Sequence, residues 1–133
     1  EEDPSKKAKY YLALADAYRA GGSFVSARNA VYSALEFRKD WGEAYMNLGN
    51  IYIAGASICG NDFEQKTVYW VAVDAFKKAL NDEDTKVRAS KSINTYSKYF
   101  PTTETCFFNG VESGKEYTVA YWINKSTIAR TSD

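Results

Sequence analysis

Apolar positions recur at helical spacing over roughly the first hundred residues of this chain of 133. The first run consists of Tyr11, Leu14, Ala15 and Tyr18. Their spacing of i, i+3, i+4 and i+7 places them on one face of an α-helix. Gly21-Gly22 then favours a break, because glycine is a poor helix former. The pattern predicts five helices, at about residues 4–20, 23–38, 41–55, 61–80 and 85–99.

The first run returns 34 residues later in the same order. The matched pairs are Tyr11 and Tyr45, Leu14 and Leu48, Ala15 and Gly49, and Tyr18 and Tyr52. A second helix with small residues follows in each copy, beginning near Ala27 and Ala72. Each unit is therefore predicted to be an antiparallel helix pair, in which the small residues at positions 15 and 49 let the partner helix approach closely.

This period and residue order resemble the tetratricopeptide repeat (TPR) family. The resemblance implies a mostly α-helical fold of TPR-like helix hairpins stacked into a superhelix. An alternative is a helical bundle whose similar helices recur by chance. Four matched positions at one constant offset favour the repeat.

The second copy of the repeat is interrupted by an insertion. Tyr18 lies 9 residues before Ala27, whereas Tyr52 lies 20 residues before Ala72, so the second copy has 11 extra residues. We expect a loop over 55–61 and a helix starting at Asn61 or Asp62, which puts the insertion at about 55–65. It is either a functional contact or a harmless elaboration, and the sequence favours neither.

The end of the chain changes character. The helix at 85–99 is polar, as the cap of a repeat array must be. Alternating residues at 117–123, a turn at Asn124-Lys125 and residues 126–130 then predict a β-hairpin. Because an isolated hairpin is marginal in water, we expect it to pack on the last helices through Trp122 or its aromatic neighbours. Residues 1–100 thus form two helix pairs and a capping helix, and 101–133 a linker and a hairpin.

The tail and the stretch 59–64 also resemble the C-terminal end of exported bacterial TPR proteins. That resemblance implies a periplasmic or cell-envelope location, with a cytoplasmic one left open. Export would suit a disulfide between Cys59 and Cys106, and the alternative is two buried free thiols. The chain begins with Glu1-Glu2 rather than Met, so we expect a processed or excised piece.

The composition excludes several classes of function. Lys and Arg number 17, as do Asp and Glu, which argues against a nucleic-acid footprint or binding to an anionic membrane surface. No apolar run approaches the roughly 18 residues of a membrane span. The chain has no histidine, which removes Ser-His and Cys-His catalysis and zinc sites that need imidazole. We assign no catalytic residue, cofactor or metal ligand.

In the TPR family the first helix of each pair lines a concave groove that holds a peptide or a protein segment. The matching positions here are Leu12, Asp16, Arg19, Met46, Asn47, Asn50 and Ile53. Asn47 matches an asparagine with which some members bind a peptide's terminal carboxylate. Leu12 and Asp16 replace that clamp's Lys and Asn, which argues against such a clamp.

The resemblance therefore implies a non-enzymatic interaction scaffold with a protein or peptide partner. The alternative is a structural C-terminal capping module of a larger multi-repeat protein, whose binding surface lies elsewhere. An enzyme using Asp16 as an acid or base is a weaker alternative, because no paired acid and base can be assigned.

Overall fold

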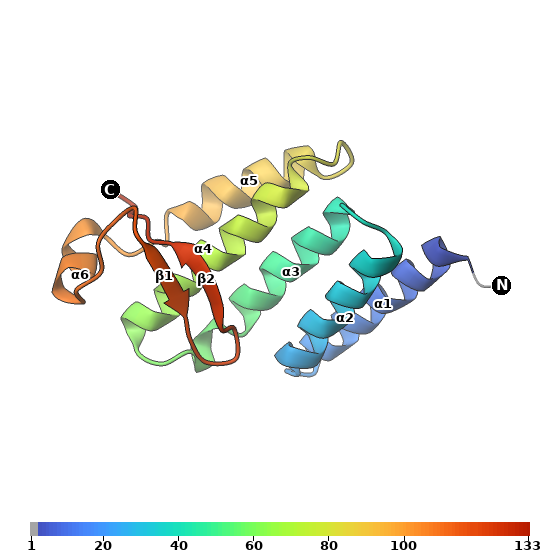
Figure 1. Ribbon diagram of the computed structural model, residues 1–133, viewed down its shortest axis with the longest axis horizontal. Coiled ribbons are helices and arrows are strands. Elements are labelled where there is room, and N and C mark those ends of the chain that lie inside the picture. Colours follow the sequence, from blue (N-terminus) through green and yellow to red (C-terminus); the bar gives the residue numbers. More distant parts are fainter. Residues whose placement is uncertain (1–2) are drawn as a thin grey trace.

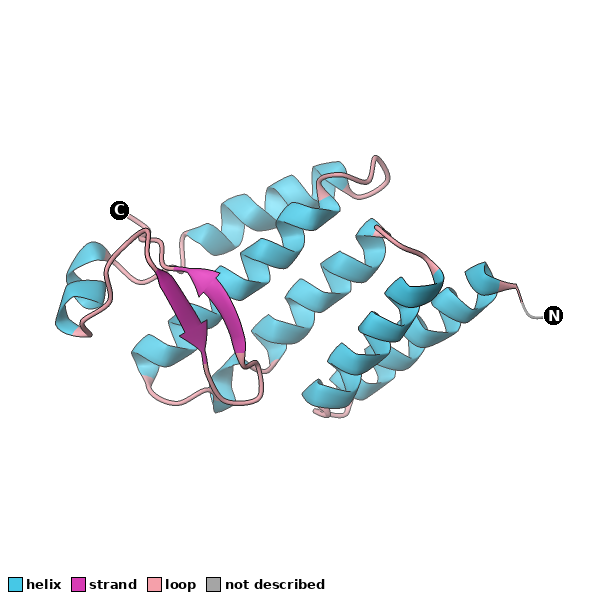
Figure 2. Ribbon diagram, in the orientation of Figure 1, coloured by secondary structure: helices cyan, strands magenta, loops and turns pink. Residues whose placement is uncertain are grey.

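The computed structural model describes residues 3–133, so the expectation drawn from Glu1-Glu2 lies outside it. The described chain is mostly helical, with a small antiparallel sheet near its end, as predicted (Figures 1 and 2). The helices are α1 (Pro4–Ala20), α2 (Phe24–Phe37), α3 (Gly42–Ala54), the 3-10 turn η1 (Ala56–Ile58), α4 (Asp62–Ala79), α5 (Lys86–Ser97) and α6 (Thr103–Phe108). The strands are β1 (Glu116–Val119) and β2 (Lys125–Ile128).

The first five helices pack in chain order. Helix α1 packs on α2, α2 on α3, α3 on α4 and α4 on α5 (Figure 1). The two helix pairs are antiparallel, as the repeat predicts, and the hairpin lies against α4. One hydrophobic cluster fills the joints between the helices, and a second lies beneath the hairpin.

Helices α3 and α4 approach closely at Gly49. This residue is buried in α3, and a Cβ built on it would lie 2.5 Å from the Phe76 ring of α4. Phe76 is itself fully buried. The expected role of the small residue at position 49 is therefore confirmed, and the partner that needs the space is an aromatic ring.

The start of α3 is not capped as its local sequence suggests. Asp40, with Glu43 three residues later, has the sequence pattern of a capping box, but Asp40 adopts the left-handed region with φ 58°. The cap position is Trp41, whose side chain makes no capping bond. Instead, the Asp82 carboxylate accepts a 2.7 Å hydrogen bond from the Gly42 N–H. The turn after α4 thus supplies the cap from 40 residues away, which local sequence cannot reveal.

The capping box of this chain lies at the start of α4. Asn61 accepts from the Glu64 N–H at 2.9 Å, and Glu64 accepts from the Asn61 N–H at 3.1 Å. This reciprocal pair satisfies two backbone donors that a helix start leaves free. The predicted helix start at Asn61 or Asp62 is confirmed.

The segment after Pro101 is more structured than a linker. Helix α6 was not predicted, and its start is capped by Thr102, which accepts from the Thr105 N–H. The hairpin pairs Glu116 with Ile128 and Val119 with Lys125.

The first strand is shorter than predicted, because the chain leaves the sheet after Val119. Tyr121 and Asn124 have positive φ angles of 62° and 42°. The loop they shape turns Trp122 toward the helices.

A tryptophan hydrogen bond at each end of the hairpin holds it on the helices. The Trp122 indole donates to the Gly55 carbonyl at 2.9 Å, and its ring lies against Phe24 and Tyr52. At the other end, the buried Trp70 of α4 donates to the Arg130 carbonyl at 2.8 Å. Trp122 is therefore an anchor of the hairpin, as expected, but it packs on α2 and α3 rather than on the last helices.

The Gly49 contact gives a first prediction. Gly49→Ala should lower the free energy of unfolding by about 1–3 kcal/mol, because a methyl group must displace the Phe76 ring. The control is Gly21→Ala, whose new Cβ would meet only ordinary contacts at 3.6 and 3.7 Å. Urea unfolding followed by circular dichroism measures both. Equal midpoints for the Gly49 variant and the wild type would contradict the contact.

The hairpin anchor gives a second prediction. Trp122→Ala should lower the free energy of unfolding by about 2–4 kcal/mol and open the hairpin to trypsin after Lys125. Phe107→Ala is the control, because Phe107 is an aromatic residue 76% exposed. If both variants resist trypsin as the wild type does, Trp122 does not anchor the hairpin.

Candidate functional site

The predicted groove positions lie on α1 and α3, and the structure separates them into buried and open residues. Leu12 and Met46 are each only 7% exposed and belong to the core between the helices. The prediction that Leu12 and Met46 make apolar contacts with a partner is therefore wrong. Both residues fill the space between neighbouring helices. Their burial depends on how closely the helices pack, which their positions in the sequence do not reveal.

The two charged groove residues, Asp16 and Arg19, are paired with each other, and a second ion pair lies nearby between α3 and α5. The Arg19 guanidinium lies 3.5 Å from the Asp16 carboxylate, one turn away on α1. On the next helices, Arg88 of α5 forms hydrogen bonds of 2.8 and 3.0 Å with both carboxylate oxygens of Glu43. This ion pair links α5 to α3 and raises the pKa of Arg88 through its hydrogen bonds to Glu43. Arg88 is thus engaged within the chain, which agrees with the argument against a carboxylate clamp.

The amide residues of α3 remain more available. The Asn47 side chain makes only a long 3.4 Å bond to the Glu43 carbonyl, and Asn50 is exposed. Each amide can donate and accept at once, which suits pairing with a peptide backbone. These two residues give the face polar contacts without a net charge.

Ile53, the last of the predicted groove positions, opens into a cavity of about 390 Å³. The cavity lies where α3, η1, α4 and the end of α5 meet. Its lining residues are Ile53, Ala56, Ser57, Asp62, Gln65, Lys66, Tyr69 and Tyr99. Four of them, Ala56, Ser57, Asp62 and Gln65, come from the inserted segment 55–65. The structure therefore brings the predicted groove and the insertion together at one place.

Two tyrosines form the aromatic wall of this cavity. The rings of Tyr69 and Tyr99 are stacked with centroids 5.3 Å apart, and Tyr99 is 52% exposed. Burial raises the pKa of Tyr69, with smaller contributions from Tyr99 and Tyr96, so its hydroxyl stays protonated. Sequence reasoning did not include these residues. The signal was available in the spacing of Tyr96 and Tyr99, which puts two aromatic rings on one side of the last helical turn.

The chemistry of the cavity is mixed. Apolar surface comes from Ile53 and the two tyrosines, while Gln65 can donate and accept hydrogen bonds. Asp62 and Lys66 stand one turn apart on α4 and carry opposite charges. Such a site can hold an apolar or aromatic side chain and contact the backbone around it.

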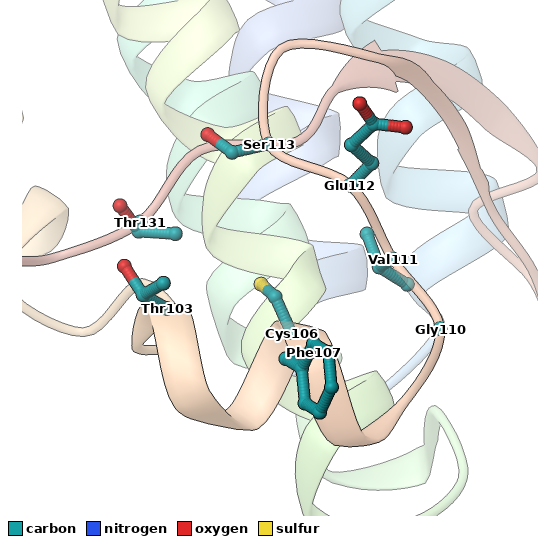
Figure 3. Close-up of a pocket in the computed structure, with 8 residues that line it drawn as sticks. All are labelled: Thr103, Cys106, Phe107, Gly110, Val111, Glu112, Ser113 and Thr131. Atoms are coloured by element: carbon teal, nitrogen blue, oxygen red, sulfur yellow. The ribbon is translucent and has the colours of Figure 1, made fainter.

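A second cavity, of about 380 Å³, lies under α6 (Figure 3). The Cys106 thiol points from α6 into this space, with Ser113 and Thr131 across from it, and Glu112 turns its carboxylate away (Figure 3). Its lining is mostly apolar. It has no arrangement of polar groups that would orient a ligand.

The two cysteines are free and buried, and each lies in a different hydrophobic cluster. Of the two alternatives, the structure has the free thiols and not the Cys59–Cys106 disulfide. The inserted loop is held instead by the Trp122 bond to Gly55. Burial raises the pKa of both thiols, chiefly through desolvation, so both stay protonated and weakly nucleophilic at neutral pH.

Among residues 3–133, no helix is both long and apolar enough to cross a bilayer. The same residues contain no group of three or more Cys, Asp or Glu side chains placed to hold a metal ion.

Comparisons with protein-family models, with curated proteins and with solved structures give no match. The resemblance to tetratricopeptide repeats consequently stays a prediction, carried by the 34-residue offset and the paired helices.

Proposed function

We propose that this chain is a TPR-like, non-enzymatic scaffold that binds an extended protein segment across α1, α3 and α5. The segment anchors one apolar or aromatic side chain in the cavity beside Ile53. The observation that carries the proposal is that this predicted groove position opens into a cavity built partly by the insertion. An insertion that merely lengthened a loop would have no reason to line the end of the groove.

The polar residues of α3 define the path along which the bound segment would lie. Asn47 and Asn50 lie one turn apart, and Ile53 follows within the next turn. A segment lying along this helix can pair its backbone with the two amides and place a side chain in the cavity. The cavity's stacked tyrosine rings favour an aromatic or branched apolar side chain.

The same face favours binding over chemistry. The acid Asp16 is paired with Arg19, and Glu43 is paired with Arg88. The chain has no histidine to act as a base, and both thiols are held protonated by burial. Nothing on the face combines an activated nucleophile with a base to serve it.

A second candidate function is the structural cap of a longer repeat array. It is favoured by α5, where Ala89 is the only buried residue and the exposed side is polar. In that case the binding surface lies outside this chain, and the cavity beside Ile53 holds nothing.

A peptide library tests the proposal. Immobilised wild-type protein should enrich peptides that share an apolar or aromatic anchor, and fluorescence polarisation then measures their affinity. Ile53→Glu should weaken binding about tenfold or more, because a charged group would be buried against the anchor. Tyr99→Ala should weaken it less, by about threefold to tenfold, through loss of the exposed ring.

Matched controls separate groove binding from general stickiness. Ile58→Glu makes the same change at a residue 60% exposed that does not line the cavity, and Tyr10→Ala removes an aromatic residue 62% exposed. Both should bind as the wild type does. Failure to enrich any peptide, or equal losses in Ile53→Glu and Ile58→Glu, would overturn the proposal and favour the cap.

A further inference from the structure

A cleft separate from both cavities described above lies between α2, α4 and the loop that joins the strands. It consists of two adjoining cavities of about 230 and 470 Å³, which share Tyr32 and Lys125. The smaller is walled by α2, α3 and α4, and the larger by α2 and the loop at 121–125. In Figure 1 the loop end of the hairpin reaches toward α2 from its position over α4.

The cleft gathers basic side chains that have no acidic partner. Lys78 and Lys125 line the smaller cavity, and Arg28 and Lys125 line the larger. The ion pairs found among residues 3–133 are Asp16–Arg19, Glu43–Arg88 and Asp74–Arg130, and none of them uses the three basic residues of the cleft. The cleft therefore concentrates positive charge in a chain whose net charge is zero.

Asp74 is the acid that lines the cleft, and it is already engaged. Its carboxylate lies 3.0 Å from the Arg130 guanidinium and accepts a hydrogen bond from the Thr127 hydroxyl. Arg130 thus compensates the charge of Asp74. Lys78 lies over the ring of Tyr45, 5.5 Å from its centroid, and so is held without losing its charge to a carboxylate.

Arg28 is fixed in place by neutral groups. Its Nη1 donates to the Trp122 carbonyl at 2.7 Å and to the Ile123 carbonyl at 3.4 Å. Its guanidinium lies over the Trp122 ring, 5.8 Å from the centroid. Its Nε is buried and has no acceptor among the described residues. The side chain is oriented before any ligand arrives, while its charge is left uncompensated.

A tyrosine pair adds a hydrogen-bond donor to the cleft. The hydroxyls of Tyr32 and Tyr52 lie 3.3 Å apart, and Tyr52 is fully buried with no other partner for its hydroxyl. Either hydroxyl can donate this bond, and when Tyr52 donates, its buried hydroxyl is satisfied. The Tyr32 hydrogen is then free to point into the cleft, where its side chain is partly exposed.

We propose that this cleft binds a small multivalent oxyanion, in which phosphate or carboxylate groups meet Arg28, Lys78, Lys125 and the Tyr32 hydroxyl. The two cavities together have the size of a small-molecule site. Several charged donors lining one site can replace the water that hydrates an anion, which a single exposed cation cannot do. The proposal is independent of the groove, because no residue lines both sites.

Calorimetric titration with pyrophosphate and with citrate, at matched ionic strength, tests the site and separates phosphate from carboxylate chemistry. At least one anion should bind, and Lys78→Met and Lys125→Met should each weaken it about fivefold. The controls are Lys77→Met and Lys115→Met, which remove exposed lysines outside the cleft and should change affinity less than about twofold. In a nuclear magnetic resonance titration, the indole N–H of Trp122 should shift.

No binding of either anion at about 10 mM would overturn the proposal, as would equal losses in the cleft and control variants. Ile53→Glu should leave anion binding unchanged. Loss of anion binding in that variant would likewise contradict the proposed site, whereas a failure of peptide binding alone would leave it standing.

Discussion

The structure depends on the burial of α4 from two sides. Phe76 faces α3 and fits against Gly49, while Trp70, six residues earlier, faces the hairpin and donates to the Arg130 carbonyl. At 3.6 residues per turn, a separation of six residues leaves the two side chains about 120° apart around the helix axis. These rings therefore point in different directions. A helix covered on one side can be amphipathic, but α4 must be apolar on both. Its buried apolar residues are divided between the two hydrophobic clusters, so α4 connects the packed helices to the hairpin.

The first four helices could be predicted because their positions follow from local pattern. The repeat in Tyr11 and Tyr45 indicated where helices lie, and glycine at 21 and 55 indicated where they end. Their caps were less predictable. The carboxylate that caps α3 comes from Asp82, and no local rule distinguishes it from Asp40, which stands at the expected place.

The tail was predicted only in part for a related reason. Alternation correctly indicated a strand beginning near Tyr117, but it continued through Trp122, which the fold uses differently. The indole gains more by reaching Gly55 and Phe24 than by extending a two-stranded sheet at its solvent edge. Tertiary contact overrides strand pattern here. The short helix α6 has too few residues for periodicity to appear, although Thr102 and Thr105 carried its cap.

The candidate site was also predicted only in part, because exposure of its residues depends on how the helices pack. The resemblance to TPR proteins pointed to Ile53, which lines a cavity, but it could not tell that Leu12 and Met46 are covered by neighbouring helices. Only the spacing of the helices decides which groove residues reach the surface. Tyr69 and Tyr99 enter the site because the insertion lengthens α4 at its start and holds it beside the end of α5.

One residue links both proposed sites to the core. Trp122 donates to Gly55, where the inserted segment leaves α3, and its carbonyl accepts from Arg28 in the basic cleft. The loop that carries it adopts positive φ angles at Tyr121 and Asn124, a conformation that costs free energy for side chains of this kind. A hairpin that served only to cover the end of an array would not need that strain. The two proposals give this loop a purpose, because the loop would support the inserted segment through Gly55 and orient the Arg28 side chain.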